Sequence, residues 1–251
     1  MHRILALSFL VCSAAHAEDW RPYVFSLEGD TLGAKHAAFE SGVGYNGVTG
    51  AGGGLQPDDA HRVQTWLYAG VGVTDWLELS GALQFADDLG QNFGFSQARV
   101  DVRARVLRPR GKVPIAISLG VGYQADALLE NALTATAAVS AYLGRVDLTL
   151  NVRAAHYFHA GRDPVDFFVS FGALVRTTHW LHLGVEYVGE ELEAAFGGDD
   201  ADVGGFGRHY LGPTAALRFW QGRIRVNATV GAVFMKQGDG ALARGSLAYL
   251  F

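Results

Sequence analysis

The feature that most constrains this chain is an alternation of polar and apolar residues, with a period of two, that recurs along most of its length. Residues 97–106 show it clearly, because every odd position is polar or charged and every even position is Ala or Val. Successive side chains of a strand point to opposite faces, so this stretch predicts a strand with one charged face. Such a strand suits a soluble β-sandwich with its charges in water. It equally suits a membrane barrel with its charges in a wet lumen and its apolar face on lipid.

Stretches of this kind follow one another along the chain, and most are close to the ~9–11 residues that a tilted strand needs to cross the hydrocarbon layer. The predicted strands are residues 36–45, 62–73, 76–85, 96–107, 113–124, 133–143, 146–158, 165–177, 181–188, 208–219, 224–235 and 242–251. The connections between them are alternately short and long. Outer-membrane barrels have short periplasmic turns and longer extracellular loops, and an even strand number places both ends of the barrel in the periplasm.

The two faces of the predicted strands also differ in side-chain size. In residues 115–123, large apolar side chains alternate with Ala, Ser and Gly, which make a poor solvent face but a good lumen wall. Aromatic residues gather at strand ends, as interfacial girdles do in membrane barrels: Trp76, Trp180, Trp220 and Phe251 near short turns, and Tyr123, Phe158, Phe167, Tyr187 and Phe234 near long loops. The sequence therefore predicts an all-β fold, a closed antiparallel transmembrane β-barrel of about twelve strands.

The N-terminus predicts export. Arg3, the apolar run at 4–15 and the small-residue site ending at Ala17 predict a signal peptide at residues 1–17. The single cysteine, Cys12, lies within it, which suits the envelope of a Gram-negative bacterium and excludes a disulfide-rich secreted class. Residues 18–35 are irregular, and we expect a short periplasmic tail, with a small plug folded into the lumen as the alternative. Residues 36–251 contain no linker and predict one outer-membrane barrel.

Alternation assigns to the lumen more arginines than carboxylates, although the whole chain has a net charge of −5. The side chains predicted to line the pore are Arg62, Glu78, Arg99, Asp101, Arg103, Arg105, Arg153, Asp166, Arg176, Glu186 and Arg225. A positive lumen favours anionic solutes. The alternative is that these charges pair across a narrow interior, since a buried unpaired charge is costly. Antiparallel pairing predicts that Glu78 faces Arg103 or Arg105, and that Gln84 lies near Gln97 or Arg99.

Other chemistry has weaker support. Outer-membrane lipid hydrolases need a Ser and a His together on the lipid-facing rim, and His156 points outward, but its predicted cross-strand neighbours are Leu133 and Val165. The acidic stretch at 189–207 matches no known metal-loop spacing, so we interpret it as a solvated loop. Lys and Arg form no continuous basic patch, which argues against nucleic acid. We therefore predict no catalytic residue, metal or cofactor.

Several segments resemble a known family. Residues 31–33, 39–45, 68–79 and 97–107 are similar to outer-membrane transporters of the "MetA-pathway of phenol degradation" type. In those proteins a Gly-(Val/Leu)-Thr-Asp-x-Leu-Glu-Leu turn joins the second and third strands, and Trp76 occupies the variable position here. The match covers the N-terminal half, and the remainder matches only as a barrel pattern. The resemblance implies a barrel fold and an uptake role, and it carries over no substrate residue.

Together these observations predict an outer-membrane channel or uptake porin for small polar, anionic or aromatic solutes. The alternative is a non-transporting structural or surface-interaction barrel, and a lipid-modifying enzyme is less favoured. The expected partners are outer-membrane lipid, small solutes and the barrel-assembly machinery. The last of these would recognise the C-terminal strand, whose final aromatic residue, Phe251, resembles the insertion signal of such barrels.

Overall fold

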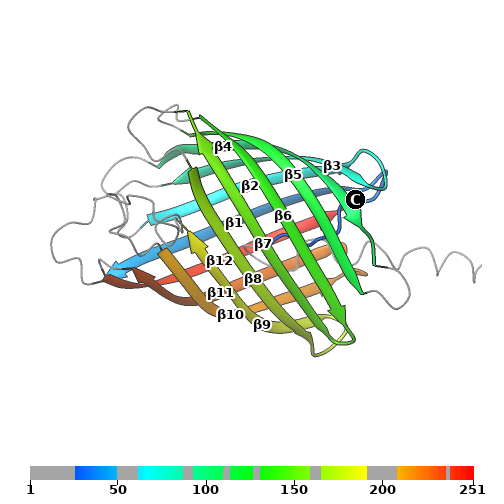
Figure 1. Ribbon diagram of the computed structural model, residues 1–251. Coiled ribbons are helices and arrows are strands. Elements are labelled where there is room, and N and C mark those ends of the chain that lie inside the picture. Colours follow the sequence, from blue (N-terminus) through cyan, green and yellow to red (C-terminus); the bar gives the residue numbers. More distant parts are fainter. Residues whose placement is uncertain are drawn as a thin grey trace, which may run out of the picture.

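A computed structural model of the chain describes residues 26–49, 62–86, 93–109, 114–126, 131–158, 165–190, 208–235 and 238–251. In these ranges twelve strands pair antiparallel in sequence order, and the first pairs with the last, so that the sheet closes into a barrel (Figure 1). The strands are β1 (Ala37–Thr49), β2 (Arg62–Gly72), β3 (Leu77–Ala86), β4 (Gly94–Leu107), β5 (Ile115–Asp126), β6 (Asn131–Leu143), β7 (Val146–Tyr157), β8 (Val165–Arg176), β9 (Leu181–Glu190), β10 (Arg208–Phe219), β11 (Ile224–Met235) and β12 (Gly238–Leu250).

The fold class predicted by alternation is confirmed, and each of the predicted strands is present among the described residues. The main difference lies at the long-loop end, where several strands extend further than their apolar pattern. Strand β1 ends at Thr49 and β12 begins at Gly238, and the two remain paired as far as Thr49 and Asp239. Backbone hydrogen bonds need no apolar side chain, so the ladder continues beyond the alternation that reveals it.

The apolar face of the barrel points outward. In β5 the outward Leu119, Val121 and Tyr123 are 52%, 65% and 46% exposed, whereas the inward Ala116 and Ser118 are fully buried. A closed barrel satisfies its backbone hydrogen bonds internally, which is what allows such an apolar face to contact lipid. A soluble sandwich would bury this face instead, so the structure excludes that alternative.

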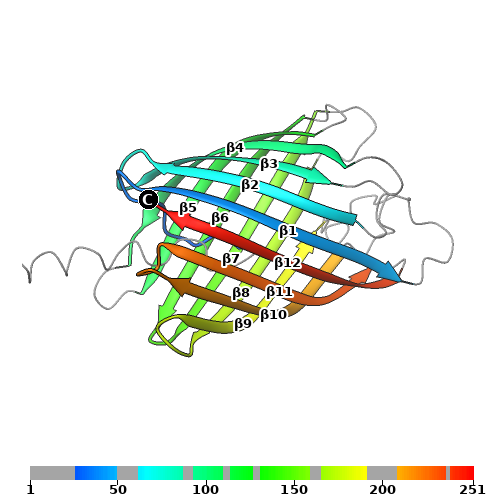
Figure 2. The same cartoon turned by 180° about the vertical axis from the view of Figure 1, so that it is seen from behind.

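The two ends of the barrel differ, as the connection lengths predicted. One end carries tight turns such as the Gly144-Arg145 turn between β6 and β7, where Gly144 has a φ of 66° that glycine adopts without strain. The C-terminus lies at this same end in both views (Figures 1 and 2). By the convention of outer-membrane barrels this is the periplasmic end. The described part of the chain contains no helix with the length and hydropathy needed to cross a bilayer.

Residues 26–34, which we call the N-terminal segment, lie inside the barrel (Figure 2). Ser26, Glu28 and Leu32 are buried, and Leu32 packs in an apolar cluster with Tyr68 and Leu250. These residues therefore lie in the lumen, the position that the small-plug alternative describes. Residues 1–25, including the predicted signal peptide, lie outside the described ranges.

Candidate functional site

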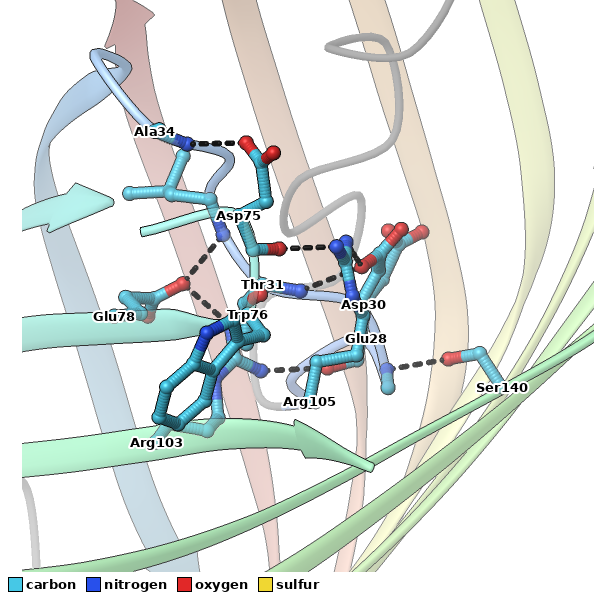
Figure 3. A network of polar contacts seen from close by, with 12 residues as sticks. Glu28, Asp30, Thr31, Ala34, Asp75, Trp76, Glu78, Arg103, Arg105 and Ser140 are labelled. Carbon is cyan, nitrogen blue, oxygen red and sulfur yellow. Dashed lines mark hydrogen bonds and ion pairs between the residues drawn. The ribbon is translucent and has the colours of Figure 1, made fainter. Parts of the chain in front are cut away.

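The N-terminal segment is joined to the barrel wall by a buried ion pair (Figure 3). Arg103 of β4 donates a hydrogen bond of 2.8 Å to Glu78 of β3, and the same carboxylate oxygen accepts the backbone N–H of Leu32 at 2.8 Å. A second guanidinium nitrogen of Arg103 donates to the carbonyl oxygen of Glu28 at 2.6 Å. The pairing of Glu78 with Arg103 that alternation predicted is confirmed, and Gln84 lies opposite Gln97 as expected. The Glu78–Arg103 ion pair therefore links β3 to β4 and binds both strands to the N-terminal segment.

The neighbouring contacts of the segment use the same strands. Arg105 of β4 donates to the carboxylate of Asp30 at 2.5 Å and to the carbonyl oxygen of Asp75, in the turn before β3. On the next part of the wall, Ser140 of β6 accepts the backbone N–H of Gly29 at 2.8 Å. Gly29 lies so close to the wall that a Cβ atom would sit 2.4 Å from the carbonyl oxygen of Ala116, so glycine is required at this approach.

The far end of the segment is bound to the opposite wall. Asn151 of β7 accepts the backbone N–H of Leu27 at 2.7 Å and donates to its carbonyl oxygen at 2.8 Å. The backbone N–H of Ser26 donates to Glu186 of β9 at 3.1 Å, and its hydroxyl donates to Ser170 of β8 at 3.0 Å. Strands β3 and β9 are six places apart in the closed order of twelve. The segment therefore crosses the lumen from one wall to the other.

A cavity of about 240 Å³ lies in the lumen beside the segment, and Leu27 forms part of its lining. Residues of β2, β3, β4, β5, β6, β7, β8, β9 and β12 complete it, so the cavity takes residues from most of the circumference. Its charged lining comprises four arginines and two carboxylates: Arg99, Arg103, Arg153, Arg244, Glu78 and Asp101. The lining is therefore positive, whereas the chain as a whole is negative.

The arginines of the cavity are held in different ways. Arg99 donates to Asp101 on the same strand at 2.6 Å, in a partly exposed pair. The guanidinium of Arg153 lies 4.2 Å from the centre of the Phe168 ring, and that of Arg244 lies 5.4 Å from the centre of the Trp66 ring. Stacking of this kind engages the face of a guanidinium and keeps its position fixed.

The structure divides the predicted pore-lining residues into groups. Glu78, Arg99, Asp101, Arg103 and Arg153 line the cavity, and Arg105 and Glu186 hold the N-terminal segment. The remaining described members are part of the inner wall: Arg176 donates two hydrogen bonds to Asp147, and Asp166 and Arg225 are buried. The side chain of Arg62 lies outside the described residues. The predicted pore-lining residues therefore belong partly to the cavity and partly to contacts that hold the segment or the inner wall together.

Sequence reasoning missed several apolar members of the cavity, among them Phe168 and Leu27. Phe168 shares a face of β8 with Asp166, so its parity alone would have placed it in the lumen. Leu27 belongs to no strand and carries no alternation signal. The cavity is consequently less polar than the predicted set suggested.

The remaining predicted features yield no additional site. His156 is exposed on the outer face between Leu133 and Val165, the neighbours that alternation predicted, with its ring 5.5 Å from that of Phe158. Across the described ranges, no group of three or more His, Cys, Asp or Glu side chains is arranged to hold a metal ion. Most of the acidic stretch at 189–207 lies outside those ranges.

Comparison with known proteins supports the fold. No family model matches the sequence, and no curated protein matches it. Among solved structures, the COG4313 outer membrane channel from Pseudomonas putida F1 has a TM-score of 0.62 at 11% identity, covering 91% of this chain and 100% of that chain. The KdgM porin has a TM-score of 0.57 at 10% identity, covering 84% and 98%. The NanC porin has a TM-score of 0.56 at 8% identity, covering 84% and 98%. All three share the barrel architecture with this chain.

Proposed function

We propose that this chain is an outer-membrane channel for the passive uptake of small anionic and polar solutes in a Gram-negative bacterium. The observation that carries the proposal is the lumen cavity, in which four arginines face two carboxylates inside a barrel whose outer face is apolar. Fixed positive charge in a narrow space raises the local concentration of anions. The solved structures of similar fold are named as porins and a channel, which supports the same conclusion.

The size of the cavity limits the class of solute. Its volume is about 240 Å³. A cavity of this kind suits a small organic anion, including an aromatic one. One solved structure of similar fold is a KdgM porin in complex with disordered oligogalacturonate, and we propose smaller solutes for this chain.

The N-terminal segment favours a second candidate function, a structural or surface-interaction barrel that conducts nothing. The segment crosses the lumen and is hydrogen-bonded on both walls. A channel function requires a path for solute past the segment, either beside it or through its displacement. Conductance of the purified barrel in a planar bilayer separates the two functions, because the structural barrel conducts no current.

Charge selectivity tests the proposed role of the lumen arginines. Replacing both Arg153→Gln and Arg244→Gln removes two positive charges from the cavity, so we expect the permeability ratio of chloride to potassium to fall severalfold. The measurement is the reversal potential in a salt gradient across a planar bilayer. Arg145→Gln is the matched control, because Arg145 is exposed in the turn between β6 and β7. An unchanged ratio in the double variant would assign these arginines a structural role only.

The C-terminal strand bears on how the barrel is inserted into the outer membrane. Strand β12 ends at Leu250, and the next residue, Phe251, is exposed, with its ring 4.6 Å from that of Tyr249 in an edge-to-face contact. We propose that this terminal aromatic pair is presented to the barrel-assembly machinery. Signal-peptide-directed export through residues 1–17 would precede that step.

A further inference from the structure

We infer that the lumen cavity is a binding site for one small organic carboxylate with an apolar body. This inference builds on the proposed function, and it adds that the solute is held at a defined site before it moves on. Four features of the cavity carry it: the positive charge of the lining, the fixed arginines, the apolar surface and the N-terminal segment on one side.

The charge of the lining selects an anion. Arg103 and Arg99 each contact a carboxylate, Glu78 and Asp101 respectively, so these carboxylates are already engaged with arginines of the wall. Arg153 and Arg244 also line the cavity, and each guanidinium lies over an aromatic ring of the same lining. A guanidinium donates hydrogen bonds in its plane, and this geometry matches the two oxygens of a carboxylate.

The rigidity of these arginines favours binding over simple attraction. The ring of Trp66 lies against Gly42, where an added Cβ would come within 2.1 Å of it, and its Nε1 donates to Glu40 at 3.1 Å. Arg244 also donates to Gln64 at 2.7 Å. A donor that is already held in place loses little side-chain entropy when a ligand arrives, so more of the interaction energy appears as affinity.

The apolar part of the lining selects an organic ligand. Leu27, Ala82, Phe168 and Val188 contribute apolar surface to the same cavity. Small-molecule sites are characteristically apolar with a few convergent polar groups that fix orientation. A chloride ion would use only the charge, whereas a carboxylate with a short apolar chain would also remove this surface from water. The volume of about 240 Å³ admits such a molecule.

The N-terminal segment closes one side of the site. Leu27 lines the cavity, and its backbone is held to Asn151 by two hydrogen bonds. Asn151 itself lines the cavity, as does Ser170, which accepts the hydroxyl of Ser26. A solute in the cavity therefore lies directly against the N-terminal segment.

The test is isothermal titration of the detergent-folded barrel with hexanoate and with hexanamide, its uncharged analogue, using empty micelles as the blank. We expect one hexanoate to bind per barrel, and hexanamide to bind about tenfold more weakly, because charge-assisted hydrogen bonds are lost. Arg153→Gln combined with Arg244→Gln should weaken hexanoate at least as much, whereas Arg145→Gln should bind it as the parent does. Ala82→Phe keeps every charge and fills the cavity, so it should also abolish binding.

The outcomes separate the site from the channel. Equal binding of hexanoate and hexanamide, or full binding by Ala82→Phe, would overturn the inferred site. Saturable hexanoate binding by a barrel that conducts no current would overturn the channel and leave the site intact. Anion-selective current without saturable hexanoate binding would overturn the inferred site and leave the proposed channel intact. The heat-modifiable mobility of each variant on a denaturing gel verifies that its barrel is folded.

Discussion

A disulfide formed by combining Ser26→Cys with Ser170→Cys is expected to abolish conductance under oxidising conditions, and reduction is expected to restore it. The two hydroxyl oxygens lie 3.0 Å apart, so sulfur atoms at these positions fall within reach of each other. Such a bond would fix the end of the N-terminal segment to β8 and prevent it from leaving the lumen. The measurement is single-channel conductance with and without reductant.

The controls for this experiment are simple because the chain has one cysteine, Cys12, within the predicted signal peptide. Each single substitution alone should conduct as the parent does and should not respond to reductant. Persistent conductance of the cross-linked barrel, with the bond verified by mass spectrometry, would mean that solute passes a seated segment. Gly29→Ala tests the opposite situation, a displaced segment, because its Cβ would collide with the wall at the carbonyl oxygen of Ala116. We expect this variant to conduct at least as well as the parent. Gly33→Ala is its match, since the nearest atom to that Cβ is 3.4 Å away.

The second large effect is expected from Glu78→Gln, which should destabilise the barrel by about 3–5 kcal/mol. The substitution leaves the guanidinium of Arg103 buried without its carboxylate and weakens the acceptor of the Leu32 N–H. A buried charge that loses its partner retains the full cost of desolvation. The measurement is the free energy of unfolding in urea, followed by tryptophan fluorescence of the folded barrel.

Asp101→Asn is the matched control for that variant. It removes the same charge from the neighbouring strand, but its pair with Arg99 is partly exposed to the lumen, with side chains 18% and 19% exposed. Lumen water reaches this pair more than it reaches Glu78 and Arg103, so we expect the change to cost less than Glu78→Gln. Equal losses in the two variants would show that the Glu78–Arg103 pair has no special part in the fold.

The alternation of the sequence predicted the barrel because each strand has one lipid face and one lumen face. Parity assigned Glu78 and Arg103 inward, and antiparallel order then placed them opposite each other, as the register confirms. The same parity would have placed Phe168 inward beside Asp166, although Phe168 was not among the predicted pore-lining residues. Where the period of two holds, the sequence therefore predicts which side chains face the lumen and which face the membrane.

The N-terminal segment could not be predicted in this way. Its position depends on backbone N–H groups that donate to single side chains far along the chain, such as Glu186 for Ser26 and Asn151 for Leu27. The partners are separated by 160 and 124 residues, and each acceptor looks like any other polar lumen residue. Such contacts produce no local periodicity in the sequence. The part of the cavity that Leu27 lines could therefore not be predicted either.

The two glutamates that accept backbone N–H groups of the segment, Glu78 and Glu186, also set an order of events in time. They belong to strands on opposite sides of the ring, so they face each other across a shared space only after β1 has joined β12. The contact with Glu78 closes a shorter loop than the contact with Glu186 and costs less loop entropy. We therefore expect complete docking of the segment to follow closure of the ring.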